Sequence, residues 1–213
     1  MYEKPLPYGY PVFFEGRYQY DRIYPLYIQM ITCTGFDIKT NKIPTIQIKK
    51  NMYYNDNEYI EHSKKGEVIS LCMTNVDLEL ALEHYNFYDL KYISGWKFKS
   101  LNGLFSKYID KWITQKIQAT KEKNKPKRSI AKLMLNSLYG KFAKGTKIRA
   151  KFPVMCDDGI VRFEMTEEQH VDGIYLPVAC FITSYARKVT IDTSQAIKDY
   201  SINNYHKDLY YYS

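Results

Sequence analysis

The sequence has few cysteines and no long apolar run. Its four cysteines (Cys33, Cys72, Cys156, Cys180) are widely scattered, with no CxxC pair and no histidines at zinc-ligand spacing. This pattern argues against a zinc site and predicts buried, reduced thiols. No apolar run approaches the ~18 residues that a membrane span requires, and residues 1–5 lack the apolar core of a signal peptide. We therefore expect a cytoplasmic protein.

The composition predicts a packed, basic protein. Hydrophobic residues make up 45% of the 213 residues, enough for the core of one large domain or two small ones. Lys and Arg total 31 against 23 Asp and Glu, a formal net charge of +8. This surplus favours a polyanionic partner, but it does not distinguish between DNA, RNA and an anionic membrane as that partner. The 22 tyrosines suit a nucleic-acid groove, although we attribute at least half of the excess to an AT-rich genome.

The first hundred residues predict a β-rich region interrupted by one helix. Residues 1–20 contain several prolines, glycines and aromatics and are expected to be irregular. The segment Thr74-Asn75-Val76-Asp77 is typical of a helix N-cap with an acid at the third helical position, and the helix that it opens fades near Phe87. Alternating or apolar runs predict strands at 24–38, 43–50, 67–73 and 90–99.

From Leu104 to Lys141 the pattern changes to two helices in a hairpin. The break lies at 123–126, and Pro126 suits the first turn of the second helix, which Gly140 and Gly145 would end. Residues 146–176 return to short strands around a turn at 157–159. A last helix is expected from Pro177 to about Lys198, followed by the start of a strand at 208–213.

The hairpin carries the densest positive charge. Between Lys111 and Lys132 there are eight basic residues and a single acid, Glu122. Arg128, Lys132 and Tyr139 share one helical face, and Lys116 projects from the preceding helix. The opposite face is predicted to be core, through Ile130, Met134 and Leu138. Cations beside a tyrosine on an anchored helix would suit a triphosphate and its base.

From composition alone, a solvated basic helix face is the better interpretation. The order of the residues changes this, because Asn136-Ser137 stands between Lys132 and Tyr139-Gly140. The stretch KLMLNSLYG at 132–140 resembles the Kx3NSxYG motif of family B DNA polymerases, in the small-phage, protein-primed branch. Other segments look like family sequence in the same order, at 7–9, 44–49, 75–80, 92–95, 103–105, 110–112 and 181–183. The resemblance covers essentially the whole chain.

The resemblance implies roles for five residues of the hairpin. Lys132 would hold the phosphates of the incoming nucleotide, Tyr139 would stack under its base, and Asn136 lies in the same nucleotide-binding motif. Lys116 matches a second nucleotide-binding lysine. Arg128 would contact the triphosphate or the priming protein, although the hairpin tip is about four residues longer than in the family, which shifts that alignment.

A second motif lies in the last predicted helix. The stretch Thr183-Ser184-Tyr185-Ala186-Arg187 is similar to the family's Tx2(A/G)R motif, which contacts the backbone of the primer terminus. Thr183 and Arg187 lie four residues apart on a helix, so a hydroxyl and a guanidinium could bind adjacent phosphates. Without the rest of the resemblance, the preferred interpretation of this motif would be a capped helix with an exposed arginine.

The resemblance also implies Mg²⁺ for the complete enzyme, held by aspartates of DxxSLYP and YxDTDS motifs. Neither motif occurs in this sequence; Met1-Tyr2 aligns just after the first, and Tyr212-Ser213 matches the opening of the second. The acids Asp157, Asp158, Glu167 and Glu168 lie in polar, turn-like surroundings and are predicted to be solvated surface. No catalytic or metal-binding residue is therefore assigned, and the chain alone is expected not to polymerise DNA.

The expected fold is α+β, a partial polymerase palm with helical-hairpin fingers and two β-rich terminal-protein-region insertions. The first insertion would cover 1–100, the fingers 101–145, the second insertion 146–176 and the partial palm 177–213. Expected partners are primer-template DNA, dNTP, the terminal (priming) protein and the remaining polymerase fragments, with no membrane. A phage or mobile element would encode the protein.

Two other interpretations stay open. The first is a non-catalytic DNA- or nucleotide-binding remnant of a polymerase, and the second, more remote, is a basic scaffold unrelated to polymerases. Translating the coding DNA beyond Ser213 separates a split polymerase from a remnant, because the former predicts Asp-Thr-Asp immediately.

Overall fold

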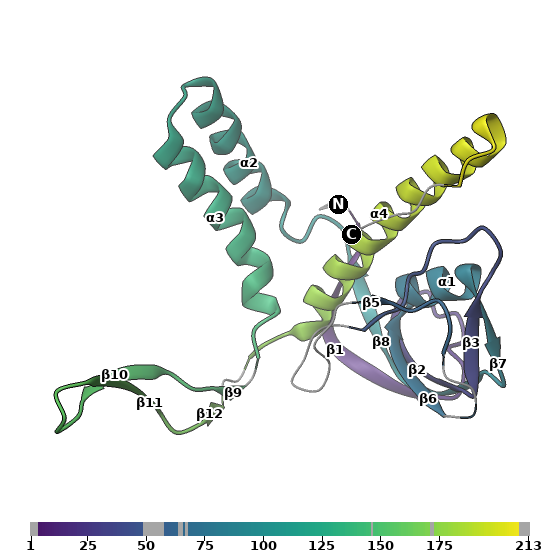
Figure 1. Ribbon diagram of the computed structural model, residues 1–213, viewed down its shortest axis with the longest axis horizontal. Coiled ribbons are helices and arrows are strands. Elements are labelled where there is room, and N and C mark those ends of the chain that lie inside the picture. Colours follow the sequence, from purple (N-terminus) through teal and green to yellow (C-terminus); the bar gives the residue numbers. More distant parts are fainter. Residues whose placement is uncertain are drawn as a thin grey trace. The chain divides into compact units, whose positions relative to one another are not determined.

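The computed structural model describes residues 4–48, 58–63, 66, 68–145, 147–170 and 173–208. The chain divides into two compact units, one formed by residues 1–106 with 180–213 and the other by residues 107–179 (Figure 1). The first unit is therefore assembled from two segments far apart in the sequence. Among the described helices, none combines the length and the apolar character that a membrane span needs.

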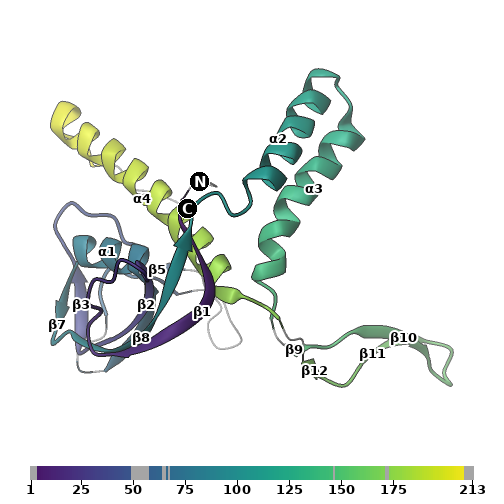
Figure 2. The same ribbon diagram turned by 180° about the vertical axis from the view of Figure 1, so that it is seen from behind.

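A four-stranded antiparallel sheet forms the centre of the first unit, as Figure 2 shows from behind. The strands follow the order β1 (Leu6–Glu15), β8 (Lys91–Leu101), β2 (Leu26–Cys33) and β6 (Ile69–Thr74). The strands predicted at 67–73 and 90–99 are confirmed as β6 and β8. The run predicted at 24–38 is two strands, because the chain leaves the sheet after Cys33 and forms β3 (Gly35–Ile38).

The prediction that residues 1–20 are irregular is wrong, because ten of them form β1. This strand lies at an edge of the sheet, where a proline costs no ladder hydrogen bond. Its pairing with β8 shifts register between Tyr8 and Val12, and Gly9 has a φ of +74° within that interval. The glycine and the prolines therefore mark a bulged edge strand rather than an absence of structure.

Two short antiparallel ladders extend the first unit. β3 pairs with β7 (Tyr85–Tyr88), and β4 (Gln47–Ile48) pairs with β5 (Glu58–Tyr59). Only part of the strand predicted at 43–50 is therefore present, and Lys49 and Lys50 lie outside the described residues. The buried Tyr85 hydroxyl donates to Ile60 O at 2.7 Å and accepts from the amides of Thr45 and Ile46. One phenol thus fixes three separate points of backbone.

Two helices pack in the first unit. α1 (Asn75–His84) begins at Thr74, whose hydroxyl accepts from the Asp77 amide at 3.2 Å, so the predicted N-cap is confirmed. α4 (Leu176–Tyr205) is longer than the helix predicted from Pro177 to Lys198. Its Phe181 ring meets the Phe98 ring of β8 edge-on at 6.4 Å. The strand predicted at 208–213 lies almost entirely outside the described residues.

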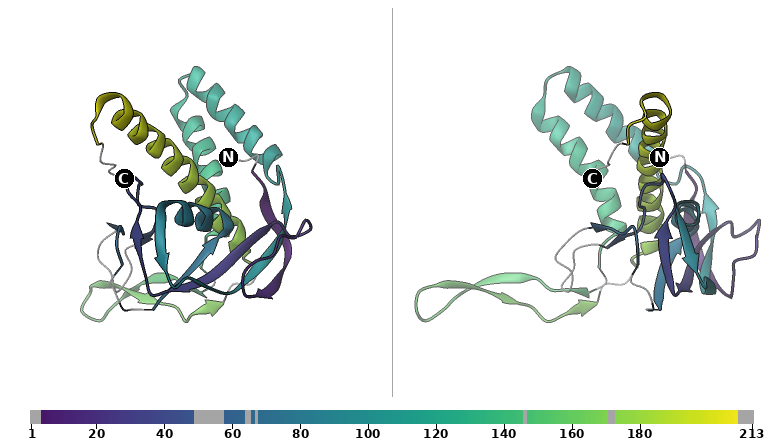
Figure 3. Two further views of the ribbon diagram at one scale, coloured as in Figure 1. Left: turned by 90° about the vertical axis from the view of Figure 1, so that its right-hand side faces the viewer. Right: turned by 45° about the vertical axis from the view of Figure 1, so that its right-hand side comes forward.

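The second unit contains a helical hairpin and two β-ladders, as predicted. Figure 3 shows the helices α2 (Ser106–Lys121) and α3 (Lys125–Phe142) running side by side in opposite directions. Asn124 caps α3 by accepting from the Lys127 amide at 3.1 Å, and Pro126 lies in the first turn. The strands are β9 (Lys147–Ile148) with β12 (Gln169–His170) and β10 (Lys151–Met155) with β11 (Val161–Met165).

The predicted core face of α3 is wrong in part. Met134 and Leu138 are half-buried, but Ile130 is 58% exposed, and the nearby Leu133 is 65% exposed. The fully buried side chains of the hairpin are Ala119 and Ala131, and the Tyr108 hydroxyl donates to Met134 O at 2.8 Å. Small side chains, rather than the large aliphatic ones, therefore lie deepest in the hairpin.

The cysteine prediction is also corrected. All four are free, but only Cys33 is buried, while Cys72 is exposed and the other two are half-buried. Cys33 packs with Phe36, Ile46 and Tyr85 in one cluster of the first unit. Strand alternation explains the difference, because Cys72 faces away from the apolar side of β6.

Candidate functional site

α3 presents an exposed basic face in the second unit. Arg128, Lys132 and Asn136 follow one another at intervals of four residues, and all three are exposed. Tyr139 lies on the same face, about 10 Å beyond Lys132 along the helix axis, and is 39% exposed. The helix therefore aligns the four predicted side chains in one row, with the cations at its N-terminal end.

Lys116 of α2 lies beside the N-terminal half of α3. Contacts near both ends of the hairpin fix this register, because Tyr108 bonds to Met134 and Glu122 pairs with Lys127 at 3.5 Å. Lys116 is thus level with the cations of α3 rather than with Tyr139. Within the part of the chain that the structure describes, Lys116, Arg128 and Lys132 have no ion pair, so their charge is available to an anion.

The remainder of the 132–140 motif also leaves this face open. The Ser137 hydroxyl donates to Leu133 O at 2.5 Å, so it is satisfied within the helix. A Cβ at Gly140 would meet nothing within 4 Å. Neither packing nor backbone conformation requires a glycine there, and its effect is to leave the surface beside Tyr139 uncovered.

The residues predicted to contact DNA lie in the first unit, on α4. Thr183 and Arg187 are four residues apart, as expected, but both have partners within the protein. The Thr183 hydroxyl donates to Cys180 O at 2.8 Å. Arg187 forms an ion pair with Asp77 of α1, in which the two side chains are 25% and 18% exposed. The arrangement joins α4 to α1.

A chain of hydroxyl groups completes this junction. The Thr74 hydroxyl donates to the Ser184 hydroxyl at 2.8 Å, and Ser184 lies within 2.6 Å of the second carboxylate oxygen of Asp77. The sequence interpretation assigned Thr74 and Asp77 only to the helix cap and missed their contacts with α4. No local pattern signals a partner 110 residues away.

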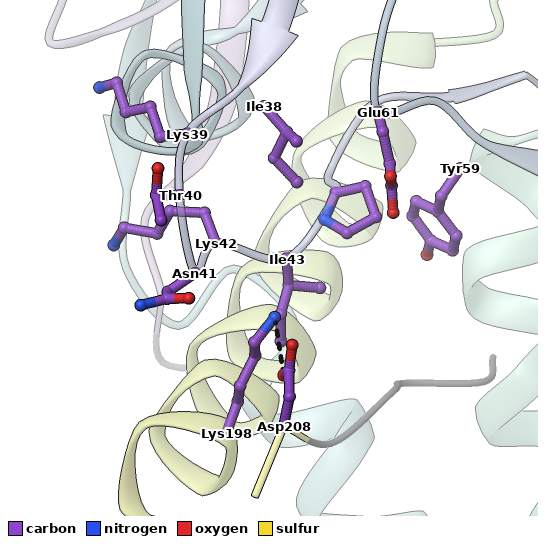
Figure 4. Close-up of a pocket in the computed structure, with 11 residues that line it drawn as sticks. Ile38, Lys39, Thr40, Asn41, Lys42, Ile43, Tyr59, Glu61, Lys198 and Asp208 are labelled. Carbon is purple, nitrogen blue, oxygen red and sulfur yellow. Dashed lines mark ion pairs between the residues drawn. The ribbon is translucent and has the colours of Figure 1, made fainter. Parts of the chain in front are cut away.

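The first unit also contains a pocket of about 380 Å³ beside the loop at 38–44 (Figure 4). Its cations are already engaged. Lys39 donates to the carbonyls of Leu82 and Glu83 at the end of α1, Lys42 pairs with Glu83 at 2.7 Å, and Lys198 pairs with Asp208 at 3.2 Å. Because two of these lysines are paired with carboxylates and the third is held by backbone carbonyls, the pocket is a poor anion site.

The described residues do not fit a metal centre. No group of three or more His, Cys, Asp or Glu side chains gathers closely enough among them to hold a metal ion. The acids at 157–158 and 167–168 are exposed, as predicted, and Asp158 and Glu168 pair instead with basic residues. The Mg²⁺ that the sequence resemblance implies has no ligand set in this part of the chain.

Comparison with known proteins identifies the family to which this chain belongs. Residues 1–212 match the family model for DNA polymerase type B, organellar and viral, and the chain belongs to that family. It is 48% identical over 199 residues to the DNA polymerases of Bacillus phage Nf and Bacillus phage phi29, covering 93% of this chain and 34% of each relative. The chain thus spans about a third of the length of these relatives.

Comparison with solved structures supports the same family. Phi29 DNA polymerase complexed with primer-template DNA and incoming nucleotide substrates matches with a TM-score of 0.84 and 47% identity, over 93% of this chain and 34% of that one. The α+β fold and the family assignment made from the sequence are therefore confirmed.

Proposed function

We propose that this chain is the part of a protein-primed DNA polymerase that holds the incoming nucleotide and the primer-template DNA. Residues 101–145 would be the fingers, 1–100 and 146–176 the two terminal-protein-region insertions, and 177–213 part of the palm. The helical hairpin and the β-ladders fall within these ranges, which supports the division. The Asp77–Arg187 pair would join the first insertion to the palm helix.

The observation that carries the nucleotide role is the row of unpaired cations on α3 followed by an exposed tyrosine. Lys132 and Lys116 would bind phosphate oxygens and offset the negative charge that develops on the leaving group. Asn136 would add a hydrogen bond, and Tyr139 would stack under the base beside the open surface at Gly140. Arg128, one turn before Lys132, would contact the triphosphate or the priming protein.

Arg187 would contact DNA without leaving Asp77. A guanidinium has five N–H donors, and the pair with Asp77 engages one nitrogen, Nη1. The remaining donors would bind a primer phosphate, and Thr183, one helical turn away, would turn its hydroxyl from Cys180 O to donate to a second phosphate oxygen. The relative solved with primer-template DNA and nucleotides supports both partners.

Equilibrium binding of dNTP to the 213-residue chain tests the nucleotide site. Replacing Lys132→Ala should weaken binding about tenfold or more, because a hydrogen bond to a charged group contributes roughly 1.5–3 kcal/mol. Lys141→Ala is the matched control, since nine residues at 100° each place Lys141 on the opposite face of α3. Titration calorimetry, with dNTP supplied as its Mg²⁺ complex, gives both dissociation constants.

Equal losses for the Lys132 and Lys141 variants would contradict the site, because they would indicate attraction by net charge alone. The chain by itself should show no Mg²⁺-dependent dNTP incorporation, since neither aspartate motif occurs in its sequence. Incorporation by the purified chain would overturn that part of the proposal while leaving the binding result intact.

A further inference from the structure

A loop of the first unit between β1 and β2 is rigidly braced. Its central residue is Tyr18, whose hydroxyl donates to Tyr24 O at 2.8 Å and accepts from the Asp21 amide at 2.9 Å. The Tyr18 ring stacks on Tyr27 of β2, with centroids 3.9 Å apart and planes inclined by 16°. Burial raises the pKa of the Tyr18 phenol above its ordinary value.

Two further contacts tie the loop to the sheet. The fully buried Gln29 side chain accepts from the Tyr18 amide at 3.1 Å and donates to Gly16 O at 3.0 Å and Ser94 O at 2.8 Å. Asp21 pairs with Lys97 of β8 at 2.7 Å. The conformation of the segment 16–25, hereafter the braced loop, is therefore set by side-chain contacts at its start, middle and end.

An aromatic layer supports the loop from below. The Phe14 ring packs edge-on against Tyr18 and Tyr27, with centroids 5.7 and 6.4 Å away. Gly95 makes this possible, because a Cβ there would lie 2.4 Å from the Phe14 ring and 2.3 Å from Ile28 O. The inner side of the loop therefore packs against aromatic rings and is not exposed to solvent.

The braced loop carries exposed side chains that have no packing role. Tyr20 is 83% exposed, and Arg22 beside it is also exposed. Lys97 and Lys99 of β8 lie over the Tyr24 ring, 5.2 and 5.9 Å from its centroid. Neither Arg22 nor Lys99 has an ion pair with another described residue.

The charge of this surface favours a polyanion. Residues 16–25 and 97–99 contain four basic side chains and one acid, Asp21, whose carboxylate is used by Lys97. An exposed aromatic ring on a braced loop, together with unpaired cations on that loop and on the adjoining strand, is an arrangement on which single-stranded nucleic acids bind, because an unpaired base offers a free face for stacking. A duplex keeps its bases stacked internally and offers no such face.

We propose that the braced loop and the adjoining end of β8 bind single-stranded nucleic acid, with Tyr20 stacking on a base and Arg22 and Lys99 binding phosphates. This surface goes beyond the nucleotide site, since none of its residues lies in the helical hairpin. Its rigidity lowers the entropy lost on binding, because the loop needs no ordering.

The test is binding of a fluorescent oligo(dT) to the 213-residue chain, measured by anisotropy over a range of salt concentrations. Tyr20→Ala should weaken binding about fivefold or more and leave the salt slope unchanged, whereas Tyr20→Phe should bind as the parent does. Arg22→Ala and Lys99→Ala should each reduce the slope of log K against log salt by about 0.7. A duplex of equal length should be less sensitive to Tyr20→Ala.

Tyr205→Ala, at the exposed end of α4, and Lys207→Ala, at an exposed position just beyond it, are the matched controls and should bind oligo(dT) as the parent does. Because all of these side chains are on the surface, circular dichroism should report unchanged folding. Parental affinity in the Tyr20→Ala and Arg22→Ala variants would overturn the proposal and would point to a protein partner for the loop. The Lys132→Ala result is independent of this outcome, so the two proposals fail separately.

Discussion

Asp77 is the residue through which α1 and α4 are joined. Its carboxylate receives Arg187 on one oxygen and Ser184 on the other, and its own amide is bound by Thr74. Two chain segments far apart in the sequence therefore meet at one side chain that is mostly shielded from water. Losing its charge leaves a guanidinium with an uncompensated charge in the same place.

Asp77→Asn should lower the free energy of unfolding by about 1–2 kcal/mol, a value reduced from that of a fully buried pair because both side chains keep some exposure. Urea denaturation measures the change. Asp192→Asn, which breaks the exposed pair with Lys188, is the control and should cost less than about 0.5 kcal/mol. Similar losses in both variants would mean that the junction contributes no more than a surface ion pair.

At the residue scale, the sequence predicts local chemistry better than distant partners. The Thr74 cap and the first-turn Pro126 were both predictable, because each depends on neighbours within four residues. The pairing of Arg187 with Asp77 was not, since it depends on how two helices 110 residues apart pack. The exposure of Cys72 has a different cause, because it follows from the alternation of side chains along β6 and not from the residue type.

The helical hairpin shows the corresponding limit at the scale of an element. Helical periodicity indicated both helices and the basic face of α3, but it does not indicate how much of an apolar stripe a single partner helix covers. Ile130 and Leu133 lie at the exposed margin of that stripe, while Ala119 and Ala131 allow the two backbones to approach. The exposure of the basic face of α3 was therefore predicted correctly, whereas the packing on the opposite side of the helix was not.

Ala131→Leu should destabilise the hairpin by about 1–3 kcal/mol, because a larger side chain has no room at a fully buried position between two helices. Hydrogen exchange of amides within α2 and α3 reports this locally. Ile130→Ala removes a larger apolar side chain one residue away and should change protection by less than about 0.5 kcal/mol. A larger loss of protection in the Ile130→Ala variant than in the Ala131→Leu variant would mean that Ile130 belongs to the core of the hairpin.

At the scale of the whole molecule, the second unit is a continuous insertion into the first. Residues 107–179 leave the first unit after β8 and return to it in α4. The first unit has its own sheet, its own apolar clusters and its own helix junction. It should therefore fold without the insertion.

Replacing residues 107–175 with a flexible Gly/Ser linker of roughly 20 residues should give a protein with a single cooperative urea transition. Near-ultraviolet circular dichroism should retain the signal of its packed aromatic residues, including Phe98 and Phe181. A deletion of α4 from the same shortened protein is the control and should abolish that transition. Loss of structure in the linked protein would show that the two units stabilise each other.

The bond between the Tyr185 hydroxyl and Pro5 O joins residues 180 positions apart, and it has a consequence during synthesis. The ribosome completes all four strands of the central sheet, β1, β2, β6 and β8, well before it makes α4. Because translation adds about 5–20 residues per second, the sheet waits roughly 4–16 seconds for the helix that covers Phe98. In that interval its apolar face is open to chaperones or to another nascent chain.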